Sequence, residues 1–266
     1  MASFAQSSGS EDTSENLFPR QEIILDSILK EANKLYSFES VAWHATDGLQ
    51  SMSRKTIDKI GSYIIYEMKD SVYCVWVDQA EKSALIEMAY SHHSYSIPAR
   101  VTEVNRSLNE YETDFIQTRS ALFNQIATDT TYGNQIGVPR NFNFNPVFFK
   151  IENGWRLYLM VGTSEYSVVP YGNDYVIECD ENGEITSFTM LHSRLLPFEY
   201  GNSEQTTITV MHNHRKSVPY ITATDICIHR LYADYHQIDL LSVIAGDPLL
   251  LFEYRISTNK IVVKEI

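Results

Sequence analysis

The chain has 266 residues, of which 21 are Lys or Arg and 34 are Asp or Glu, so its formal net charge is −13. This charge repels both a phosphate backbone and an anionic membrane surface, and it excludes generic nucleic-acid binding. A hydrophobic share of 44% with a charged share of 21% indicates a folded protein with a substantial core, and no apolar run is long enough to span a membrane.

The amino-terminal residues 1–19 are predicted to be a disordered tail, because residues 1–15 are small, polar and acidic. Within them, Ser3-Phe4-Ala5-Gln6 is similar to the junction that remains after a signal peptide is removed, with Met1 as an added start residue. We therefore expect an exported protein, periplasmic or secreted. A cytoplasmic protein with an ordinary N-terminus is the alternative.

Residues 20–130 are predicted to form a helix, a sheet and a second helix. Apolar side chains recur with a helical period over 21–36 and again over 109–127, where Asn109 is a suitable N-cap. Between these helices lie three strand-like runs at 61–68, 72–77 and 84–90, and a short turn joins the first two as a hairpin.

Residues 131–266 are predicted to form a β-rich part that contains one helix. Residues 128–146 have no period and indicate a loop or boundary. Turns at Asn153-Gly154 and Asn182-Gly183 are typical of hairpins. Strands are predicted at 147–151, 155–162, 175–179, 184–191, 206–211, 240–245, 249–256 and 260–265, with the helix near 225–235. The fold class is therefore α+β with antiparallel sheet dominant, and the two parts are either separate or share one core.

Three histidines lie where predicted strands end. His192 follows the strand at 184–191, and His212 and His214 flank Asn213 after the strand at 206–211. Residues two apart in an extended chain point to the same side, so the imidazoles of His212 and His214 can face one point. Asp225 lies in the first turn of the predicted helix, where it can form a capping box if Thr222 is the N-cap.

Two imidazoles and one carboxylate are a common ligand set for catalytic zinc, because three protein ligands leave a fourth position for water. We interpret His212, His214 and Asp225 as metal ligands. His192 is a candidate fourth ligand or proton carrier, and His229 is a further candidate because it lies on the same helix face as Asp225. Zinc would lower the pKa of bound water to about 7 and supply hydroxide at neutral pH.

The same residues also have a structural interpretation. The two histidines of the HxH pair can be surface residues, because Arg215, Lys216 and Ser217 follow them in a polar segment. Asp225 can simply cap its helix, and His192 can simply bond a backbone carbonyl. Under this interpretation the chain is a non-catalytic exported binding protein. It can also be an acidic inhibitor or immunity-type protein, whose charge of −13 steers it to a cationic target.

His212-Asn213-His214 followed by Thr222-Ala223-Thr224-Asp225 resembles the JAMM (MPN) metalloprotease motif, H-x-H-P followed by S-x-x-D. The resemblance implies zinc ligands at His212, His214 and Asp225, and a hydroxyl at Thr222 that steadies the oxyanion. Arg215 stands where that motif has proline. The upstream general base of that family has loose candidates here in Glu178, Glu165 and Glu199, and we take either His192 or Glu178 as the residue that moves protons.

A broader resemblance, to a family of uncharacterised, exported bacterial proteins, covers most of the chain. It implies export and one coherent unit, but no reaction. The segments that carry it are Leu35-Tyr36 with Glu39, Trp43 and Thr46-Asp47; Gly172-Asn173-Asp174-Tyr175; Leu191-His192; His212-Asn213-His214; and Ile221-Thr222-Ala223-Thr224-Asp225-Ile226-Cys227. The function expected from the sequence is therefore a zinc-dependent hydrolase of a peptide or amide-type substrate, with the two non-catalytic functions as alternatives.

Overall fold

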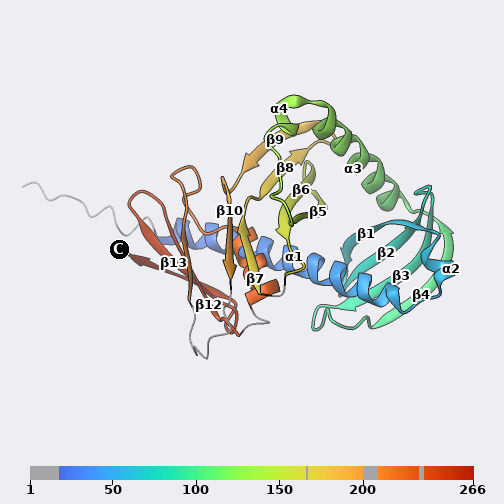
Figure 1. Ribbon diagram of the computed structural model, residues 1–266, viewed down its shortest axis with the longest axis horizontal. Helices are drawn as coiled ribbons and strands as arrows, with labels where there is room; N and C mark the ends of the chain where they lie inside the picture. The colour runs from blue at the N-terminus through green and yellow to red at the C-terminus, as the bar shows by residue number, and fades with distance from the viewer. Residues whose placement is uncertain (1–17, 166, 200–208, 234–236) are drawn as a thin grey trace, which may run out of the picture.

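The computed structural model describes residues 18–165, 167–199, 209–233 and 237–266 (Figure 1). The predicted α+β class is confirmed, and antiparallel pairing dominates: among the named strands, only β11 and β12 pair in parallel. The predicted tail lies outside the described residues except at its last two positions. Export of the chain therefore stays a prediction.

The first helix, α1 (Phe18–Gln50), is much longer than the predicted helix at 21–36. Its apolar stripe continues through Phe38, Val41 and Ala45, which are buried. The hydrophobic pattern is interrupted by three polar residues that are also buried, Ser37, Glu39 and Ser40. The second half of the helix was therefore not predicted. In Figure 1, α1 crosses the molecule and connects the sheet formed by β1–β4 with the C-terminal strands.

The amino-terminal sheet is an antiparallel meander of β1 (Ile60–Met68), β2 (Ser71–Asp78), β3 (Ser83–Ser91) and β4 (Arg100–Ser107). The first three match the predicted strands. The fourth was not predicted, because it is largely exposed and offers no apolar alternation. Short α2 (Arg54–Ile57) precedes the sheet, and α3 (Glu110–Thr128) follows it. Asn109 and Glu112 form a capping box at the start of α3, as its sequence favours.

A second antiparallel sheet begins the β-rich part. Its order is β5 (Asn143–Ile151), β6 (Gly154–Gly162), β8 (Tyr175–Cys179) and β9 (Ile185–Met190), and short α4 (Thr130–Gly133) precedes it. Two strands outside this sheet, β7 (Val168–Gly172) and β10 (Leu195–Glu199), pair with each other. Neither was predicted, because each contains a proline, and Pro170 and Pro197 stand opposite one another in the ladder.

The last sheet has the order β11 (Val210–Asn213), β12 (Leu240–Ala245), β13 (Leu250–Arg255) and β14 (Lys260–Glu265). Between β11 and β12, the predicted helix is α5 (Ala223–Ile228), which continues into a π-helical turn, η1 (His229–Ala233). Part of the predicted strand 206–211 lies outside the described residues. The observed strand begins at Val210, so His212 lies inside it and His214 directly follows it.

The main hydrophobic core joins elements from both parts of the chain. It includes buried Leu35 of α1, Trp76 of β2, Ile226 of α5 and Phe252 of β13. Helix α5 is buried along its whole length and packs on α1, so the start of α5 is held firmly. No helix within the described ranges combines the length and apolar character needed to cross a membrane.

Candidate metal centre

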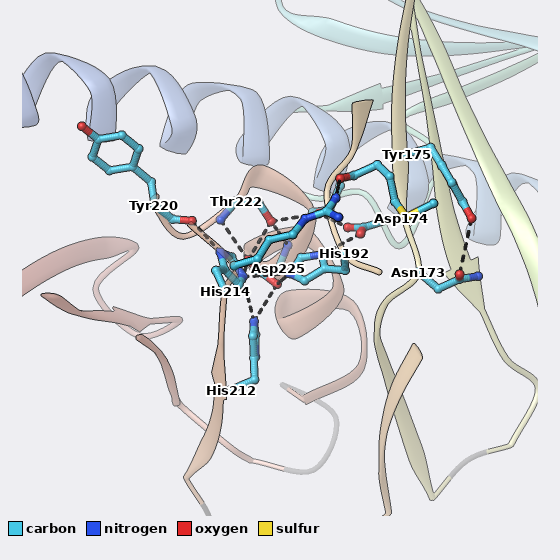
Figure 2. A network of polar contacts seen from close by, with 12 residues as sticks. Asn173, Asp174, Tyr175, His192, His212, His214, Tyr220, Thr222 and Asp225 are labelled. Carbon is cyan, nitrogen blue, oxygen red and sulfur yellow. Dashed lines mark hydrogen bonds and ion pairs between the residues drawn. The ribbon is translucent and has the colours of Figure 1, made fainter. Parts of the chain in front are cut away.

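Four side chains singled out by their sequence pattern meet at one point: His192, His212, His214 and Asp225 (Figure 2). One donor atom of each lies within 4.8 Å of the donor atoms of the other three. The Nε2 atom of His214 is 2.8 Å from that of His192 and 3.1 Å from that of His212. Zinc–nitrogen bonds of about 2.0–2.1 Å place tetrahedral ligands about 3.4 Å apart, so this set can hold a metal ion.

The backbone of β11 fixes the HxH pair. His212 pairs with Val243 of the parallel neighbour β12, and the amide of His214 donates to the carbonyl of Ile244 at 2.8 Å. The two side chains are two residues apart in extended chain and therefore project to one side, as predicted. Both are almost completely buried, with exposed fractions of 7% and 0%. The interpretation of this pair as surface residues is therefore wrong.

Asp225 uses its two carboxylate oxygens differently. Oδ2 accepts hydrogen bonds from the amide of Thr222 at 2.9 Å and from its hydroxyl at 2.6 Å. The amide bond, together with the donation from the amide of Asp225 to the hydroxyl oxygen of Thr222 at 3.2 Å, is the predicted capping box. Oδ1 is buried without a hydrogen-bond partner among the described residues. It lies 3.1 Å from Nε2 of His212 and 3.3 Å from Nε2 of His192. A buried oxygen without a hydrogen bond is costly, and a cation among these atoms would satisfy it.

The outer nitrogens of two imidazoles fix their tautomers. Nδ1 of His214 lies 2.7 Å from the carbonyl oxygen of Tyr220, which can only accept, so this nitrogen carries a proton. Nδ1 of His192 lies 2.6 Å from Oδ1 of Asp174 and likewise donates. In the neutral rings, the Nε2 lone pairs therefore point into the cluster. Metal-binding histidines are typically held in this way, with the outer N–H on a carboxylate or backbone carbonyl.

Asp174 is a functional candidate that sequence reasoning missed. It is buried in the turn between β7 and β8, and the hydroxyl of Thr224 donates to its Oδ2. Its own carbonyl accepts from the amide of Leu191 at 3.0 Å, which ties this turn to the residue before His192. The segment that contains Asp174 was noted only for its resemblance to other chains. A lone acidic residue in a turn gives no signal of which side chain it contacts at the end of the β8–β9 hairpin.

Gly172 allows the close approach of this turn to His192. Its φ is +78°, and a Cβ there would lie 2.5 Å from the carbonyl oxygen of Arg194 and 3.2 Å from Cβ of His192. We expect Gly172→Ala to lower the free energy of unfolding by about 1–3 kcal/mol, measured by urea denaturation. Gly137→Ala is the control, because nothing lies within 4 Å of its added Cβ. Equal losses in the two variants would contradict this explanation.

Charges within the cluster shift the pKa values of Asp225 and His192. Burial alone would raise the pKa of Asp225, but the imidazoles of His192, His212 and His214 outweigh burial and hold it well below its usual range. Burial disfavours protonated His192, but the carboxylates of Asp174 and Asp225 outweigh burial and raise the pKa of His192 to about 9. Without a metal, the cluster is therefore held together by a buried ion pair.

This raised pKa predicts how the stability of the metal-free protein depends on pH. His192 binds a proton more tightly when folded, so its stabilising contribution is complete below its unfolded pKa of about 6.5 and is lost as pH rises through about 9. We expect the free energy of unfolding in the presence of a chelator to fall by up to about 3 kcal/mol over that window. His192→Gln should flatten the profile. An equally steep profile in the variant would assign the effect to other groups.

Three other predicted site residues lie elsewhere or are already engaged. Glu178 of β8 is not part of the cluster: it accepts from Nε of Arg156 at 2.9 Å. The hydroxyl of Thr222 is buried between Asp225 and Thr224, so it holds Asp225 in place. Nδ1 of His229 lies 2.7 Å from the hydroxyl of Tyr171, and burial lowers the pKa of His229 to about 4.

A cleft of about 530 Å³ opens beside the cluster and is lined by all three clustered histidines. Tyr171 of β7 and Phe198 of β10 also line it. These histidines border the cleft, although their side chains are almost completely buried, with exposed fractions of 6% for His192, 7% for His212 and 0% for His214. A donor set that could hold a metal ion therefore lies beside a cleft.

Comparisons of the chain with protein-family models, with curated proteins and with solved structures found no match. The interpretation of this site therefore depends on its own geometry and chemistry.

Proposed function

We propose that the protein binds a zinc ion through His212, His214 and Asp225. The observation that carries the proposal is the convergence of imidazole Nε2 atoms on the buried carboxylate of Asp225, one oxygen of which has no hydrogen bond among the described residues. Nitrogen and carboxylate donors suit zinc, and three such ligands leave a coordination position open. Thr222 supports the site by holding the other oxygen of Asp225.

We further propose that the site hydrolyses a peptide or amide-type bond of a substrate in the adjoining cleft. Bound zinc would supply a Lewis acid and a water of lowered pKa. His192 lies on the wall of the cleft with its Nε2 2.8 Å from that of His214. We assign His192 as the group that accepts the proton of the water and delivers it to the leaving amine, with Asp174 orienting its ring.

The test combines metal content with turnover. Untagged protein after mild dialysis should contain zinc by elemental analysis, and its hydrolysis of a mixed peptide library, followed by mass spectrometry, should be lost with a chelator and restored by zinc. Absence of any transition metal together with no thermal shift on addition of zinc would remove the proposal. Bound zinc without turnover of any peptide or amide would leave a structural metal site.

Replacing Asp174 tests the assignment of His192. Asp174→Asn keeps the shape of the side chain but removes the charge that orients the imidazole, so we expect turnover to fall about 10–100-fold. Zinc content should stay near that of the wild type, because Asp174 is outside the ligand set. The pH profile of kcat should also shift, since the charge of Asp174 raises the pKa of His192. A loss of zinc with no change in that profile would make His192 a ligand.

A further inference from the structure

The cleft beside the cluster carries a charge opposite to that of the chain as a whole. The chain has a net charge of −13, yet Arg194 and Arg215 line this cleft and, among the described residues that line it, none is Asp or Glu. Arg194 is two residues after His192, and Arg215 directly follows His214. Both arginines therefore line the same cleft as the histidines of the cluster.

The two arginines are held differently. The guanidinium of Arg215 donates to the carbonyl oxygen of Met190, which anchors it at the end of β9. Arg194 is exposed, and within the described part of the chain its guanidinium has neither a hydrogen-bond nor an ion-pair partner. In both residues, N–H donors remain for a ligand. A guanidinium fork matches the two oxygens of a carboxylate, with geometry that a lysine cannot reproduce.

Apolar side chains of β10 and β11 also line the cleft, beside the polar residues Ser193 and Asn213. Leu196, Pro197 and Met211 line the same cleft. A ligand that fits all of these surfaces has an uncharged or apolar body and one negative group. Such a ligand would be drawn selectively to this part of an otherwise acidic molecule.

We propose that the substrate carries a carboxylate next to the bond that is cleaved, and that Arg194 and Arg215 bind this carboxylate. The inference rests on the proposed hydrolase function and specifies its substrate class. A carboxylate held at the mouth of the cleft would orient the neighbouring amide towards the histidines. Its source is either a free C-terminus or an acidic side chain, and the experiment below distinguishes them.

The experiment measures binding separately from turnover. Isothermal titration calorimetry compares three probes, N-acetyl-Ala-Ala, its C-terminal amide and N-acetyl-Ala-Glu amide, on the protein as purified and after one equivalent of zinc. We expect a carboxylate probe to bind about tenfold or more tightly than the neutral amide, since a hydrogen bond to a charged group contributes that much. Preference for the first probe indicates a C-terminal carboxylate, and preference for the third an acidic side chain.

The variant Arg194→Gln with Arg215→Gln should lose this preference and keep its zinc content. Arg100→Gln, an exposed residue of β4, is the matched control because it changes the net charge without touching the cleft. Equal binding of acid and amide by the wild type, or a preference that persists in the double variant, overturns the inference. Mass spectrometry of the same mixtures tests the proposed function independently: preference without cleavage removes the hydrolase but leaves the carboxylate site.

Discussion

His214→Ala is expected to abolish tight zinc binding. The side chain of His214 is fully buried, and its Nε2 contacts those of both other histidines and lies 3.2 Å from Oδ2 of Asp225. Removing this ligand leaves donors that cannot enforce a tetrahedral site, so the affinity should fall by far more than the 10–100-fold that loss of an outer partner causes. Competition with a chromophoric chelator measures the affinity directly.

The same variant should lose stabilisation by zinc. Zinc at about 100 times its dissociation constant should add about 2.7 kcal/mol to the unfolding free energy of the wild type, and almost nothing to that of the variant. His93→Ala is the control, because His93 is exposed in a loop outside the cluster. A zinc-dependent rise in Tm that is the same in all three proteins would place the metal elsewhere.

Regular periodicity is what made much of the fold predictable. In strands β1 to β3 and in the hairpin of β5 and β6, apolar and polar residues alternate or turn residues mark the strand ends. Asn109 as N-cap and a stripe of apolar residues predict α3. Elements whose hydrophobic pattern is interrupted were not predicted. The pairing of β7 with β10 was missed because each strand contains a proline, and the second half of α1 was missed because it contains buried polar residues. Tertiary packing outweighed local preference in both places.

The candidate site was predictable where local geometry alone positions a side chain. The two-residue spacing of His212 and His214 holds in any extended strand, and Thr222 with Asp225 forms a capping box within a single turn. The orientation of His192 depends on Asp174, which lies beside it because β8 pairs with β9 and the amide of Leu191 donates to the carbonyl of Asp174. The two strands of this hairpin were predicted but their register was not, so Asp174 was missed; Glu178, named from the metalloprotease resemblance, lies outside the cluster.

Asp225→Asn separates the two tasks of the one carboxylate in the cluster. As a helix cap, asparagine is a close substitute, because its carbonyl oxygen can still accept from the amide of Thr222. A role in capping alone therefore predicts a small loss of stability and unchanged zinc binding. As a ligand, the carboxylate supplies the negative charge and the oxygen that has no other partner.

We therefore expect Asp225→Asn to weaken zinc binding by more than about 100-fold, above the range for loss of an outer partner. Thr222→Ala is the matched comparison: it removes the hydroxyl that caps the helix and should cost about 1 kcal/mol of stability, with a smaller loss of affinity. Calorimetric titration with zinc measures the zinc affinity of each variant. Urea denaturation in the presence of a chelator measures its free energy of unfolding. If Thr222→Ala lowers zinc affinity as much as Asp225→Asn does, the charge of Asp225 does not hold the ion, and Asp225 acts only in the capping box of α5.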